Sequence, residues 1–220
     1  FNRHLSLTDQ KKNSLTALLE TTIETNDLNH KNIYIGGFSS GGNVSLLLGN
    51  HLTKIKSKIQ PKGVFIIDSP LDLVALYRSA DKSIERNFSA VAVEEANWIK
   101  AMFDKKYGHP DSSMVQYENA SPYVMETASL RNLAALKNIK IRLYTEPDTT
   151  WWLKNRQARY EDMNAYFIKD LAEELHKTGY QKVSFVPTEN RGYRSNGDRH
   201  PHSWAVADPV ALLKWMEEKE

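Results

Sequence analysis

Residues 37–41 read Gly-Phe-Ser-Ser-Gly, and they directly follow the short apolar run at 33–35. In this setting the pattern G-x-S-x-G predicts a strand, a sharp turn and then a helix, with Ser39 at the apex of the turn. Glycine lets the backbone bend tightly because it has no Cβ atom to clash. The turn therefore limits both fold and chemistry, because it would expose the Ser39 hydroxyl at the end of a strand, where a histidine can reach it.

The rest of the chain predicts helices and strands in alternation. The run at 64–67 is apolar without interruption, as expected for a parallel strand covered on both faces. This order of elements predicts an α/β fold with a parallel sheet. We expect helices over residues 8–25, 40–51, 157–177 and 209–219, and strands over residues 32–36, 64–67, 139–145 and 182–186.

A long segment without a strand pattern separates the strand that ends at Asp68 from the strand that starts near Ile139. It is too long for a simple crossover, since such connections rarely exceed about 15 residues without structure of their own. We therefore predict a helical, cap-like insertion over residues 70–138, within a single domain that spans residues 1–220. Helical segments are expected around 71–80, 91–107 and 127–136, separated by His109-Pro110 and Ser121-Pro122.

Composition excludes several classes of function. Lys and Arg total 29 against 27 Asp and Glu, so the formal net charge is only +2, and nothing favours binding to nucleic acid or an anionic membrane. The chain has no cysteine, which excludes disulfides, thiol catalysis and cysteine metal sites. No apolar run approaches the roughly 20 residues that a membrane helix needs. The sequence does not distinguish a cytoplasmic protein from one secreted after loss of an N-terminal segment.

A serine is a poor nucleophile unless a base, usually histidine, accepts its proton and a carboxylate orients that base. His202 lies between the last predicted strand and the closing helix, and Asp148 follows the predicted strand at 139–145. The chain order Ser39, Asp148, His202 is therefore the order nucleophile, acid, base that suits a sheet of this kind.

Two other carboxylates could serve as the acid. Glu146 lies two residues before Asp148 and would orient the histidine if its strand ended earlier. Asp68 ends its own strand, where it could act as the acid or cap the next helix. His200 and His202 could also contribute to a metal site, but no third ligand stands at a typical spacing, so we expect no metal and no cofactor.

Three pieces of the chain resemble the α/β-hydrolase family: the turn at 37–41, the acid turn at 145–148 and the histidine loop at 202–204. The resemblance covers nearly the whole chain and is nearest to esterase and dienelactone-hydrolase-like members. It implies Ser39 as nucleophile, Asp148 as acid, His202 as base and the Ser40 backbone N–H as an oxyanion donor.

The function implied is a serine hydrolase that cleaves a carboxylic ester through an acyl-enzyme on Ser39. Its substrate would be a small ester or a short peptide, and the insertion at 70–138 would cover the site. A serine peptidase or acyltransferase with the same triad is one alternative. A binding protein of the same fold without turnover is another. The sequence indicates neither the substrate groups nor the oligomeric state.

One feature departs from the family pattern. The family usually places several strands before the nucleophile strand, and an early loop supplies half of the oxyanion hole. Here one predicted helix precedes that strand, so we expect the early strands to be absent from this chain. The second oxyanion donor is therefore expected in residues 1–7 or in sequence outside this chain.

Overall fold

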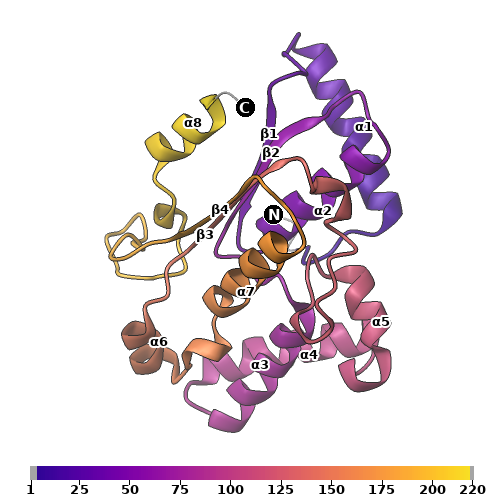
Figure 1. The fold of residues 1–220 in the computed structure, drawn as a ribbon. Coiled ribbons are helices and arrows are strands. Elements are labelled where there is room, and N and C mark those ends of the chain that lie inside the picture. Colours follow the sequence, from indigo (N-terminus) through magenta and orange to yellow (C-terminus); the bar gives the residue numbers. More distant parts are fainter. Residues whose placement is uncertain (1–3, 219–220) are drawn as a thin grey trace.

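The computed structural model describes residues 4–218, and within them the centre of the fold is a four-stranded sheet (Figure 1). All three strand pairings are parallel, with the order β1-β2-β3-β4. The predicted fold class, α/β with a parallel sheet, is confirmed. The strands are β1 (Ile33–Phe38), β2 (Pro61–Ile67), β3 (Lys140–Thr145) and β4 (Val183–Pro187).

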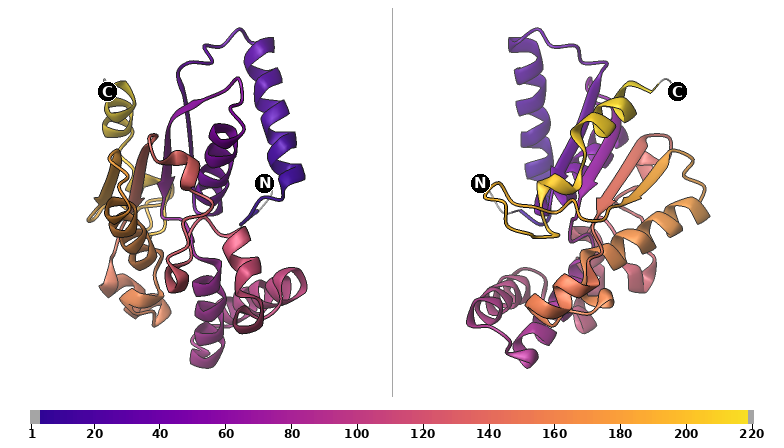
Figure 2. Two further views of the ribbon diagram at one scale, coloured as in Figure 1. Left: turned by 45° about the vertical axis from the view of Figure 1, so that its right-hand side comes forward. Right: turned by 90° about the vertical axis from the view of Figure 1, so that its left-hand side faces the viewer.

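Helices cover both faces of this sheet, which gives three layers (Figure 2). Helices α2 and α7 pack on one face, α8 lies on the other, and α1 packs outside α2. The α-helices are α1 (Asp9–Thr25), α2 (Ser40–Lys54), α3 (Leu73–Arg86), α4 (Ala90–Tyr107), α5 (Pro110–Ala120), α6 (Thr149–Arg156), α7 (Asn164–Lys177) and α8 (Pro209–Glu217); short 3₁₀ turns are η1 (Met125–Thr127), η2 (Ala134–Leu136), η3 (Tyr160–Asp162) and η4 (Trp204–Val206).

The central strands supply apolar side chains to both layers of the core. Successive residues of a strand point to opposite faces, so a strand covered on both sides is apolar throughout. In β2, Val64 and Ile66 pack toward α2 and α7, whereas Ile67 packs with Tyr144 on the α8 side. All four side chains are almost fully buried. This two-sided burial explains the uninterrupted apolar run in the sequence.

Helices α3, α4 and α5 form the segment between β2 and β3, and they lie beyond the carboxyl ends of the strands (Figure 1). They have an apolar cluster of their own. Phe103 is almost fully buried in it and contacts the rings of Tyr107 and Tyr117 edge-on. The segment is therefore a separately packed helical layer at the end of the sheet where parallel α/β folds bind ligands.

The break expected at His109-Pro110 lies between α4 and α5, but α5 itself was not predicted. Pro110 occupies the first turn of α5, where its missing N–H costs nothing, and His109 caps the helix. The helix expected over 127–136 does not form. Ala128 has a left-handed backbone (φ 48°), and only the short turns η1 and η2 are helical there.

The long helix expected over 157–177 is also shorter than predicted. Gln157 adopts a left-handed conformation that ends α6, and α7 begins only at Asn164. Helix α6 itself was not predicted.

Within residues 4–218, no helix has both the length and the apolar character needed to cross a membrane. The same residues contain no group of three or more His, Asp or Glu side chains arranged to hold a metal ion.

Candidate active site

Ser39 lies at the tight turn between β1 and α2. Its backbone angles are φ 55° and ψ −128°, a strained combination for a residue other than glycine. The turn is held by the Ser39 N–H, which donates to the Ile67 carbonyl at the end of β2 (2.9 Å). A Cβ atom on Gly37 would lie 2.4 Å from the Gly41 carbonyl group, so only glycine fits there. The predicted strand, turn and helix are therefore formed, with Ser39 at the apex.

His202 connects two of the residues singled out from the sequence. Its Nε2 lies 3.1 Å from Ser39 Oγ, and its Nδ1 lies 2.6 Å from Asp68 Oδ2. A carboxylate can only accept, so Nδ1–H donates to Asp68 and Nε2 is left to accept the Ser39 proton. The three side chains form a continuous hydrogen-bonded chain from carboxylate to hydroxyl.

Asp68 is held rigidly at the end of β2. Its carboxylate is buried, and Oδ1 accepts a hydrogen bond from Thr145 Oγ1 (2.8 Å). Its backbone carbonyl accepts from Asn164 Nδ2 (3.0 Å), and its φ of 43° is positive. The side chain, backbone and neighbouring strand thus fix the carboxylate in the orientation that meets His202.

Asp148, expected from the sequence to orient His202, lies elsewhere. It caps α6 by accepting from the Trp151 N–H (2.8 Å), and its Oδ2 is paired with Arg199 (2.5 Å). The expected Asp148–His202 contact was wrong, because α6 starts immediately after the acid turn and uses the Asp148 carboxylate as its cap. Of the three candidate acids, Asp68 is the one bonded to His202.

Glu146, the third candidate acid, is almost fully buried beneath the histidine loop. Its Oε2 accepts hydrogen bonds from Thr188 Oγ1 (3.0 Å) and from the backbone N–H groups of Arg191 (2.8 Å) and Gly192 (2.9 Å). Its Oε1 forms an ion pair with Arg199. All of these partners belong to the loop that leads to His202. Sequence patterns did not indicate this attachment of Glu146 to the loop.

Aromatic side chains flank the histidine loop. The Phe38 ring lies 4.4 Å from the His202 ring and 5.5 Å from the exposed Trp204 ring, between centroids. His200 packs against Trp151 (4.6 Å) and its Nδ1 donates to the His202 carbonyl (3.0 Å). Burial lowers the pKa of His200 to about 4, so this imidazole is neutral at pH 7.

Oxyanion donors come from the start of a helix in sites of this kind. Ser40 is the first residue of α2, where a backbone N–H has no partner within the helix. Part of the segment expected to hold the second donor, residues 1–3, lies outside the described residues. The rest approaches the same helix, because Asn43 Nδ2 donates to the Leu5 carbonyl (3.2 Å).

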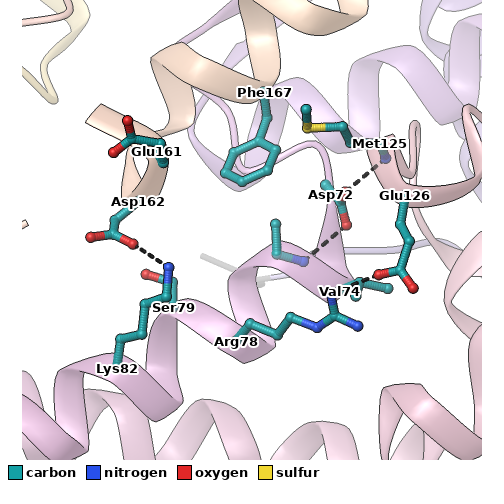
Figure 3. Close-up of a pocket in the computed structure, with 11 residues that line it drawn as sticks. Asp72, Val74, Arg78, Ser79, Lys82, Met125, Glu126, Glu161, Asp162 and Phe167 are labelled. Atoms are coloured by element: carbon teal, nitrogen blue, oxygen red, sulfur yellow. Dashed lines mark hydrogen bonds and ion pairs between the residues drawn. The ribbon is translucent and has the colours of Figure 1, made fainter. Parts of the chain in front are cut away.

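A cavity of about 460 Å³ opens between α3 and the segment of η3 and α7 (Figure 3). Asp72, which caps α3 and follows Asp68 by four residues in the sequence, lines the cavity. Burial raises the pKa of Asp72. Neither Ser39 nor His202 lines the cavity. Its apolar lining includes Val74, Met125 and Phe167, and the ion pairs Arg78–Glu126 and Lys82–Asp162 also line it.

No family model matches the chain, and no curated protein matches its sequence. Among solved structures, the chain is similar to a candidate esterase from Staphylococcus aureus, with 13% identity over 96% of this chain and a TM-score of 0.46. It spans 58% of that protein's length. It is also similar to the Vlm2 thioesterase domain solved with a dodecadepsipeptide bound, with 15% identity over 92% of this chain and 72% of that one, and a TM-score of 0.39.

Proposed function

We propose that this chain is a serine hydrolase of the α/β-hydrolase type that cleaves carboxylic esters, with Ser39 as nucleophile, His202 as base and Asp68 as acid. The hydrogen-bonded chain from Asp68 through His202 to Ser39 carries the proposal. Its two distances, 2.6 and 3.1 Å, are within the range expected of a nucleophile, its base and the group that orients the base.

The reaction follows from the positions of these atoms. His202 Nε2 takes the Ser39 proton as Oγ attacks the ester carbonyl, and Asp68 stabilises the imidazolium that forms. The Ser40 N–H donates to the oxyanion of the tetrahedral intermediate. His202 then gives its proton to the departing alcohol, and the acyl group remains on Ser39 as an acyl-enzyme. Water, activated by His202, releases the acid and restores Ser39.

Three further roles belong to the same proposal. The segment from residue 4 to residue 7 is the source of the second oxyanion donor, because it runs beside the first turn of α2. Helices α3 to α5 act as a cap, because they lie beyond the carboxyl ends of the strands that carry Ser39 and Asp68. The whole chain belongs to one hydrolase domain, with this cap as an insertion at 70–138.

Turnover of a small activated ester such as 4-nitrophenyl acetate tests the proposal. Ser39→Ala should lower kcat by at least about 10³-fold, since the nucleophile is lost. Ser45→Ala is the control, because Ser45 lies in α2, the helix that follows Ser39, and its hydroxyl donates to the Gly41 carbonyl. Equal turnover by the wild type and the folded Ser39→Ala variant would overturn the proposed role of Ser39.

A further inference from the structure

His202 lies near the end of a long loop, residues 188–203, that connects β4 to η4 and has little regular secondary structure. A base must keep its hydrogen bond to the nucleophile within a few tenths of an ångström, because a misplacement of about 1 Å can cost 10²-fold in rate. Irregular loops do not provide such rigidity by themselves. Something outside the loop must therefore hold it.

The buried Glu146 carboxylate holds the first arm of this loop, residues 188–192. Glu146 is 2% exposed, and its Oε2 accepts three hydrogen bonds, all from residues at or near the start of the loop. The donors are Thr188 Oγ1 and the N–H groups of Arg191 and Gly192. Hydrogen bonds to an ionised acceptor are about twice as strong as neutral ones. The end of β3 is thereby joined to the start of the histidine loop.

Arg199 holds the second arm of the loop, residues 199–202, against the same carboxylate. Its guanidinium forms an ion pair with Glu146 and another with Asp148 (2.5 Å). It also donates from Nη1 to the Gly192 carbonyl in the first arm (2.6 Å). The contact with Glu146 Oε1 is an ion pair without hydrogen-bond geometry, so the hydrogen bonds to Asp148 and Gly192 define the orientation of the planar guanidinium. Both arms of the loop are thus attached to one buried charge.

The second arm continues directly into His202. The His200 N–H donates to the Gly192 carbonyl (2.9 Å), and the His200 ring donates to the His202 carbonyl (3.0 Å). The arms are too close to shift independently, since a Cβ on Gly192 would lie 2.6 Å from Pro201 Cα. A displacement of Arg199 would therefore move the backbone that carries His202.

We propose that Glu146 and Arg199 are positioning residues for the ester hydrolysis proposed above: their ion pair fixes the loop at 188–203 and so holds His202 in register with Ser39 and Asp68. The inference rests on the proposed function. Neither side chain bonds to Ser39 or His202 among the described contacts. The two residues therefore act through the loop and do not react.

The test compares kcat and KM for 4-nitrophenyl acetate in Glu146→Gln, Arg199→Gln and the double variant. Each single variant should lower kcat about 10–100-fold and change KM less than about 3-fold, because the geometry of the base changes and the substrate surface does not. The double variant should lose no more than the worse single variant, because the two residues form one unit. Arg199→Lys, which keeps the charge without the fork, should recover part of the loss.

Two variants on the same loop serve as charge-matched controls. Glu189→Gln removes an exposed carboxylate, and Arg194→Gln removes an exposed guanidinium. Both should keep wild-type kcat. Circular dichroism and the unfolding midpoint of every variant restrict the comparison to folded protein. If Glu146→Gln does not fold, Arg199→Gln and Arg199→Lys decide the question.

The outcomes separate this inference from the proposed function. If Ser39→Ala abolishes turnover but folded Glu146→Gln and Arg199→Gln keep kcat within about 3-fold of the wild type, the positioning role is wrong and the hydrolase stands. Strict additivity in the double variant would also contradict it. If Ser39→Ala does not reduce turnover, the proposed function is wrong, and the positioning role that rests on it is wrong as well.

Discussion

Ser39 and Asp68 share an uncommon backbone feature, since both have positive φ angles, 55° and 43°. For residues other than glycine such conformations cost of order 1–3 kcal/mol and persist only where the surrounding structure imposes them. Each residue ends one of two paired strands, and each backbone N–H donates to a neighbouring strand. The strain therefore falls on the two residues whose side chains meet His202.

Substitution of the two candidate acids distinguishes their roles at the residue scale. Asp68→Asn should lower kcat by about 10³–10⁴-fold, because the amide cannot stabilise the imidazolium and can select the wrong tautomer of His202. Asp148→Asn should cost less than about 10-fold, because asparagine caps a helix as well as aspartate and only one Arg199 contact is lost. Ester turnover of both variants provides the comparison. A larger loss in Asp148→Asn would contradict the assignment of the acid.

His200 makes stability depend on pH. The pKa of His200 is about 4 in the folded protein and near 6.5 in the unfolded chain. At pH values between these two, His200 is therefore more often protonated in the unfolded chain than in the folded protein. The stabilisation is complete above pH 6.5 and is lost as the pH falls toward 4, with a size of order 2 kcal/mol.

Denaturant unfolding at pH 7 and pH 4.5 measures this effect. His200→Phe keeps a ring against Trp151 but cannot titrate, so its free energy of unfolding should fall less over the same interval. Equal pH dependence in the wild type and His200→Phe would show that His200 is not responsible.

At the scale of elements, sequence patterns predicted the strands and the helices that pack on them, because burial on both faces leaves apolar runs and helical periodicity. These patterns failed where single residues determine the start or end of a helix. The break at His109-Pro110 was predicted but α5, which begins there, was not, and the helix expected over 127–136 is replaced by short turns from which Leu133 and Leu136 fill the core. Asp148 was interpreted as an acid although it caps α6.

The insertion of α3 to α5 should respond as a unit to loss of its central side chain. Phe103→Ala removes a ring that is 1% exposed and should cost about 3–5 kcal/mol. Because its contacts lie within the insertion cluster, hydrogen exchange should increase across α3, α4 and α5 more than in β1 to β3. A uniform increase over the sheet and the insertion would contradict a separately packed layer.

At the scale of the whole molecule, the candidate triad depends on which strands are neighbours. The sequence favoured Asp148 as the acid and kept Asp68 as an alternative, and each of them follows a strand at the same edge of the sheet. The structure pairs β2 directly with β1, whereas β3 is one strand further from Ser39, about 5 Å more. His202 follows β4 in the chain, and its long loop returns to Ser39 across a separation of 163 residues. Strand order and loop path are long-range properties that no local motif encodes.

The most direct test of the central claim is covalent labelling of the protein with a fluorophosphonate, followed by mass spectrometry of its peptides. Such probes react with a serine whose proton is taken up by a neighbouring base. We predict one label per chain, on the peptide that contains Ser39, with the label lost in Ser39→Ala and strongly slowed in Asp68→Asn. Absence of label on the folded wild type, or label at another serine, would contradict the claim that Ser39, His202 and Asp68 form a working triad.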